Sequence, residues 1–136
     1  MEHYTSIKQS VKLLGLGLDP SSSDMCWEYM ENCDGNFPYY SHPECHKAEE
    51  ENDIPCWSVG ALMKILPNEY PYNTCIYYTS GGWCCDINAE QEPEVDGMHY
   101  EYPKELAVFY NDNIVDSLYE MVCWLLENGY IDKTKQ

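Results

Sequence analysis

Hydrophobic and polar positions alternate most regularly near the carboxyl end of the chain. Between Asp112 and Glu127 apolar residues recur every three or four positions, which predicts an amphipathic helix. Asn111 or Asp112 can cap its start, and Gly129 can end it in the left-handed conformation. The apolar stripe consists of Ile114, Val115, Leu118, Met121, Val122, Leu125 and Leu126.

Two shorter stretches also predict helices. Thr5 to Leu16 carries apolar residues on one face and is followed by Gly17, a frequent helix-ending residue. The segment IPCWSVGALMKILP contains Ser58, which can cap a short helix, and Pro67, which can end it. Because a helix this short is marginal alone, it depends on packing against other elements.

Strand-like alternation appears in four places, at residues 24–30, 74–79, 83–87 and 98–102. The second and third stretches are separated by Ser-Gly-Gly, which predicts a hairpin. In contrast, residues 32–53 are polar and rich in Pro, Gly, His and Glu, so they predict a long loop. Residues 88–97 predict an acidic loop.

These elements predict an α+β fold, with a small antiparallel sheet of three to four strands packed by two to three helices. The long C-terminal helix is its most strongly indicated part. A chain of 136 residues buries about two-thirds of its surface on folding, which suffices for a core. We therefore expect a single globular domain over residues 1–136.

The charge balance limits the partners that this chain can bind. It has 24 acidic residues against 7 basic ones and a formal net charge of −17. Nucleic acids and anionic membranes attract cationic proteins, so we expect neither as a partner. The acids cluster between residues 44 and 53 and between 86 and 101. A high negative charge can serve solubility alone, and it can also recognise a basic protein.

The sequence shows no secretory leader and no apolar run long enough to cross a membrane. We therefore expect a cytoplasmic protein whose eight cysteines stay reduced and form no structural disulfides. We expect no cofactor.

The stretch CDGNFPYYSHPECH places Cys33, His42, Cys45 and His46 within a short span. Structural zinc sites pair close ligands on two sides, and here only His42 and Cys45 have such spacing. This pattern favours a polar loop whose thiols and imidazoles are incidental, with zinc binding by these four residues as the alternative.

Cys56 is the candidate nucleophile of the chain. A thiol just before a helix can be activated by the helix dipole, and His99 follows later as a candidate base. However, Cys56 has apolar neighbours and no evident oxyanion donor accompanies it. The pattern favours a small core residue over a catalytic one.

Tyrosines in loops offer a different lead, because tyrosine is enriched at protein interfaces. Two such stretches, FPYYSHP and NEYPYN, accompany the acidic run that follows the first of them. The candidate binding residues are Tyr39, Tyr40, Tyr70, Tyr72, Glu49, Glu50, Glu51 and Asp53.

Two segments, IPCWSVGALMKILP at residues 54–67 and MVCWLLENGYI at 121–131, resemble a family of small uncharacterised proteins encoded on prophages and mobile elements of gut anaerobes. No activity is assigned to that family, so the resemblance implies a genomic setting and no functional site.

The sequence thus favours a small acidic accessory protein that binds another protein, including by mimicry of a polyanion. The alternatives are a thiol- or metal-dependent hydrolase and a purely structural assembly role.

Overall fold

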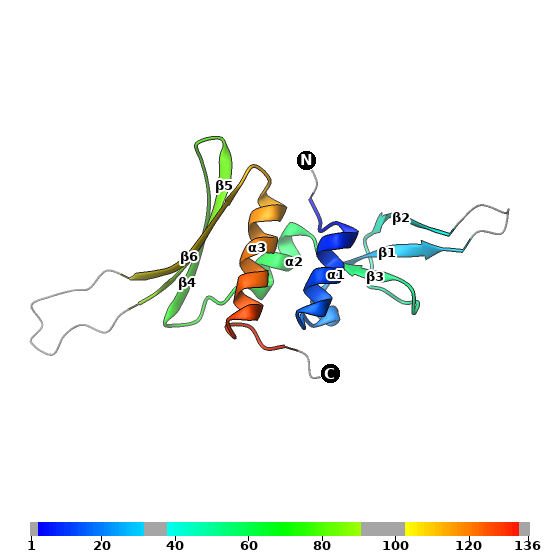
Figure 1. The fold of residues 1–136 in the computed structure, drawn as a ribbon, viewed down its shortest axis with the longest axis horizontal. Coiled ribbons are helices and arrows are strands. Elements are labelled where there is room, and N and C mark those ends of the chain that lie inside the picture. The colour runs from blue at the N-terminus through cyan, green and yellow to red at the C-terminus, as the bar shows by residue number, and fades with distance from the viewer. Residues whose placement is uncertain (1–2, 32–37, 91–102, 134–136) are drawn as a thin grey trace, which may run out of the picture.

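The computed structural model describes residues 3–31, 38–90 and 103–133. Figure 1 shows three helices in the middle of the molecule and a three-stranded antiparallel sheet on either side. The first sheet has the strand order β2-β1-β3, and the second has the order β4-β5-β6. In chain order the elements are α1 (Ile7–Gly15), a short 3-10 turn (Pro20–Ser22), β1 (Met25–Met30), β2 (Tyr39–Glu44), β3 (Ile54–Cys56), α2 (Val59–Ile65), β4 (Tyr72–Thr79), β5 (Gly82–Ala89), β6 (Lys104–Asn111) and α3 (Ile114–Glu127).

The predicted α+β class and the long C-terminal helix are confirmed. Helix α3 packs on β5 and β6 with one side and on α2 with the other, while α1 contacts β3 and α3. The helices therefore form a shared layer that joins the two sheets.

The core is built mainly from this helical layer. The whole apolar stripe predicted for the last helix is buried, together with Trp57, Leu13 and Leu62. Ile87 and Cys85 contribute from the central strand of the second sheet. Each large apolar side chain buried in this way contributes roughly 1.5–3 kcal/mol of transfer free energy.

The helix ends follow the chemistry of their residues. In α1, Ser6 and Gln9 form a capping box. Helix α3 begins at the Asn113 cap, so the predicted caps Asn111 and Asp112 were one to two residues early. At its other end Gly129 has φ +77°, and the amide of Tyr130 donates to the carbonyl of Leu125 at 2.9 Å. These bonds satisfy helix carbonyls that would otherwise lack a partner.

The predicted hairpin is confirmed. Ser80 and Gly81 both have positive φ, as a two-residue turn between twisted strands requires. The Tyr110 side chain reaches back from β6, and its hydroxyl donates to the Ser80 carbonyl at 2.9 Å. Its ring lies so close to Gly82 that a Cβ there would meet it at 2.6 Å. The strand predicted at residues 98–102 falls outside the described residues, and β6 was not predicted.

The prediction of one long loop over residues 32–53 was wrong where the structure describes it. Residues 39–44 form β2, which pairs with β1 across an irregularity between Trp27 and Tyr29. Pro43 argued against a strand in the sequence, because proline cannot donate a backbone hydrogen bond. It is tolerated here because β2 lies at the sheet edge. Pro55 lies in the other edge strand, β3, for the same reason.

In the described part of the chain, none of the helices has the length and apolar character needed to span a membrane.

Substituting two glycines should have opposite effects on stability. Gly129→Ala places a side chain in the left-handed region and should lower the free energy of unfolding by about 1 kcal/mol. Gly15→Ala replaces the last residue of α1, where a Cβ meets no atom within 4 Å, and it should raise that free energy by up to about 1 kcal/mol. Urea unfolding of both variants measures the difference, and equal effects would contradict the cap described here.

Candidate functional site

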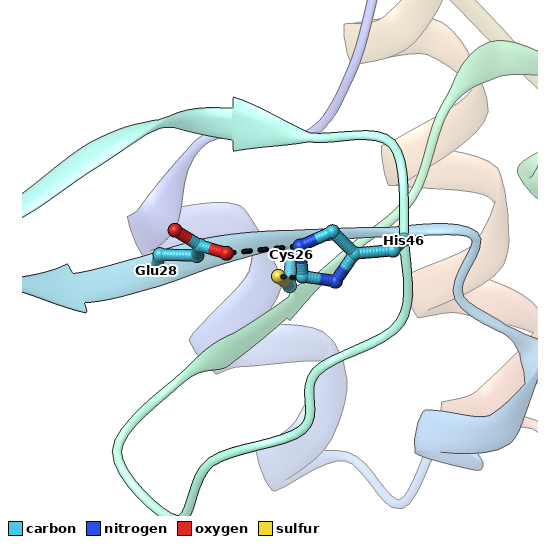
Figure 2. A group of neighbouring side chains, drawn as sticks. All are labelled: Cys26, Glu28 and His46. Atoms are coloured by element: carbon cyan, nitrogen blue, oxygen red, sulfur yellow. Dashed lines mark hydrogen bonds and ion pairs between the residues drawn. The ribbon is translucent and has the colours of Figure 1, made fainter.

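Cys26, Glu28 and His46 come together on one face of the first sheet (Figure 2). Cys26 and Glu28 are two residues apart in β1, so their side chains leave the same face of the strand. The chain leaves β2 and turns back across that face, and this turn places His46 over β1. The closest potential ligand atoms of the three side chains lie within 4.8 Å of one another.

Hydrogen bonds define the protonation of the His46 ring. Nδ1 lies 2.8 Å from the Lys47 carbonyl oxygen, which can only accept, so Nδ1 carries a proton. Nε2 lies 2.9 Å from Oε1 of Glu28, a carboxylate that also accepts. The Lys47 carbonyl first and the Glu28 carboxylate second raise the pKa of His46 above its ordinary value. The ring is therefore a cation at mildly acidic pH, held between two acceptors.

The thiol of Cys26 is held in its neutral, protonated form. Its sulfur is fully buried and lies 3.8 Å from Nδ1 of His46. Burial first and nearby carboxylates second raise the pKa of Cys26 to about 11. While both ring nitrogens carry protons, His46 cannot act as a base toward this thiol. The carboxylates that act on Cys26 belong to Asp53, Glu28, Glu44 and Glu49.

One of the four sequence candidates for metal binding takes part in this cluster. His46 belongs to it, whereas His42 and Cys45 do not, and Cys33 lies outside the described residues. The sequence did not point to Cys26 and Glu28, because both lie in β1, ahead of the stretch that contains the candidate cysteines and histidines. The pattern Cys-x-Glu on a strand would have placed both side chains on one face, but nothing in the sequence indicates which later residue covers them.

Cys56 occupies a buried position at the end of β3, three residues before α2 begins. Its Sγ donates to the Thr5 carbonyl at 3.3 Å, and Thr5 Oγ1 lies 3.7 Å from the same sulfur. Burial raises the pKa of Cys56 to about 11. These contacts favour a structural thiol that ties β3 to the amino-terminal segment. His99 lies outside the described residues, so the predicted dyad stays a hypothesis.

The tyrosines considered as binding residues belong to two separate regions. Tyr39 and Tyr40 lie in β2, whereas Tyr72 begins β4, on the far side of the helices (Figure 1), and Tyr70 lies in the turn just before it. They therefore do not form one surface.

Two of the candidate binding residues organise the acidic loop that follows β2. Asp53 accepts hydrogen bonds from the amides of Tyr29 and Glu50, and these bonds hold the pKa of Asp53 below its ordinary value. Tyr40 packs edge-on against Tyr29, with ring centroids 5.6 Å apart. Glu49, Glu50, Glu51 and Tyr39 remain exposed on the outside of this arrangement.

Comparison with protein-family models, curated proteins and solved structures finds no match to this chain. The resemblance to proteins of mobile elements thus stays a prediction.

Glu28→Gln should lower the pKa of His46, because the amide no longer offers a full negative charge to Nε2–H. A raised histidine pKa stabilises the fold below the unfolded-state value of about 6.5, and this contribution is lost as pH rises through the folded-state pKa. The stability difference between wild type and variant should therefore be largest at mildly acidic pH. NMR titration of the His46 ring in both proteins measures the shift, and equal midpoints in the two proteins would contradict this prediction.

Alkylation of the native protein should modify Cys45 well before Cys26 and Cys56. Cys45 is exposed, whereas burial protects the other two thiols and raises the pKa of each to about 11. Mass spectrometry after brief iodoacetamide treatment near neutral pH measures the order. Preferential modification of Cys56 would revive the nucleophile hypothesis.

Proposed function

We propose that this chain is a small binding protein whose acidic first sheet engages a basic region of another protein. The observation that carries this proposal is the concentration of carboxylates on β1, β2 and the loop that returns to β3. The described acids in this part of the chain are Asp24, Glu28, Glu31, Glu44, Glu49, Glu50, Glu51 and Asp53.

Little positive charge offsets these carboxylates. Lys47 is the basic residue among described residues 24–31 and 38–53, histidines aside, and its ammonium donates to the Ser21 carbonyl at 2.7 Å. Burial and then four of these carboxylates raise the pKa of the Cys26 thiol beneath this surface. A surface of this kind attracts lysine- and arginine-rich partners and speeds their encounter.

Exposed apolar side chains accompany the acids. Met30 and Tyr39 pair across β1 and β2, and 37% and 52% of their surfaces are exposed. Tyrosine and methionine are enriched at protein interfaces, where they fill pockets of the partner. We propose that this pair anchors the partner while the surrounding carboxylates set its orientation.

A sharper form of the proposal is mimicry of a polyanion, in which the carboxylates occupy the site of a nucleic-acid-binding protein. Cytoplasmic location and an origin on a mobile element belong to the same proposal and rest on the sequence.

The proposal predicts that the partner binds more weakly at high salt and that its binding requires the carboxylates of the first sheet. The variant E49Q/E50Q/E51Q should bind the captured partner roughly tenfold more weakly at low salt, since each exposed charge pair contributes up to about 1 kcal/mol. The matched control E105Q/E120Q/E127Q removes the same charge from exposed positions of β6 and α3 and should bind like wild type.

A photo-crosslinking residue at position 39 should capture that partner, and the same residue at position 110 should not. Tyr39 and Tyr110 are similarly exposed, at 52% and 49%, but belong to different sheets. Salt-insensitive binding, or equal loss in both charge variants, would contradict the proposed surface.

A further inference from the structure

We propose that Cys26, Glu28 and His46 form a binding site for a divalent transition metal, with Zn²⁺ as the ion that best suits it. The proposal departs from the sequence-based expectation of a polar loop without metal. It does not depend on the protein-binding proposal, because it is tested at Cys26, Glu28 and His46, whereas that proposal is tested at other residues of the sheet.

The donor set is the first argument. A thiolate, an imidazole and a carboxylate are the three ligand types of protein zinc sites, whereas Ca²⁺ and Mg²⁺ prefer oxygen alone. Two donors come from β1 and the third from the turn after β2, and their ligand atoms lie within 4.8 Å of one another. In a tetrahedral zinc site neighbouring ligand atoms lie roughly 3.3–3.7 Å apart, as the bond lengths require. Side-chain rotation can close the remaining distance, since His46 is 43% exposed.

The orientation of His46 is the second argument. Its Nδ1–H donates to the Lys47 carbonyl at 2.8 Å, so Nε2 is the nitrogen that can bind a metal once its proton is lost. The Cys26 sulfur lies 3.8 Å from Nδ1, and the ring has to turn slightly for Nε2 and the thiolate to share one ion. Metal-binding histidines usually make this kind of second hydrogen bond, because it fixes the ring and the tautomer. Nε2 already faces the Glu28 carboxylate at 2.9 Å (Figure 2). A bound metal would replace the proton between them and move the two atoms apart to roughly 3.3 Å.

The charge balance is the third argument. Binding of M²⁺ releases one proton from the Cys26 thiol and one from Nε2 of His46, and forms bonds to sulfur, nitrogen and the Glu28 oxygen. The divalent cation, the thiolate and the carboxylate sum to zero charge, so the complex is neutral. Glu44 lies directly opposite Cys26 in the β1–β2 pairing, and its carboxylate adds a favourable potential for a cation. A fourth coordination position remains for water.

Titration of the full chain with Co²⁺, a spectroscopic substitute for Zn²⁺, tests the proposal. We expect one equivalent to bind with a sulfur-to-cobalt charge-transfer band, and Zn²⁺ to displace it. Cys26→Ser should abolish the band. Glu28→Gln and His46→Gln should each weaken binding by at least about tenfold.

Matched controls separate this cluster from the other thiols and imidazoles. Cys75→Ser removes an exposed thiol of the second sheet and His3→Gln an exposed imidazole near the amino end, and both should bind Co²⁺ like wild type.

Absence of the charge-transfer band in the wild type would overturn the proposal, as would a band that survives Cys26→Ser. If Cys26→Ser does not fold, the Glu28→Gln and His46→Gln variants decide, since both residues are partly exposed. Affinity unchanged in those two variants would assign the metal to other residues. None of these outcomes bears on whether the acidic surface binds a protein.

Discussion

Burial of α3 on two sides is the constraint on which the rest of the structure depends. A three-stranded sheet has one apolar face to cover, and the two sheets lie on opposite sides of the helices, so neither covers the other (Figure 1). Nine residues of α3 are buried, because β5 and β6 lie on one side of the helix and α2 on the other. Ser117 adds a hydrogen bond from its hydroxyl to the Trp83 carbonyl at 2.7 Å. The helix thus serves both halves of the molecule as their common apolar surface.

The first sheet reaches this layer through a narrow connection. β3 leads directly into Trp57, whose ring is fully buried in the core. The amide of Thr5 donates to the Trp57 carbonyl at 2.9 Å, and the Trp57 amide donates to Thr5 Oγ1 at 3.1 Å. Because the fold is anchored there, the outer part of β1, β2 and the loop after β2 contribute little to the core. Carboxylates can gather on that part without burying charge.

The sequence determined the helices better than the sheets, for a physical reason. The last helix repeats its apolar stripe over four turns, and its end is marked by Gly129, so local chemistry alone defines it. Strand β2 has no such pattern, since Pro43 interrupts it and its pairing with β1 is irregular. β2 is identified as a strand by its pairing with β1 and not by its own sequence.

The cluster at His46 shows the same limit. The residue itself stood out among the histidines and cysteines, but Cys26 and Glu28 are brought to it by the return of the chain after β2. The loop after that return is held to β1 by the hydrogen bond from the Tyr29 amide to Asp53, a contact that no spacing rule reveals. The cluster forms through contacts between separate elements, so the sequence does not reveal it. The last helix follows from the periodicity of its own residues, so the sequence predicts it.

The contact between Tyr110 and Gly82 limits which residues the chain can accept at position 82 in the course of evolution. The tyrosine ring occupies the space where any larger residue at position 82 would carry its Cβ. A mutation at position 82 therefore displaces the ring and breaks its bond to the turn, unless position 110 also changes. A side chain at position 82 is therefore tolerated best where position 110 already carries a residue smaller than tyrosine.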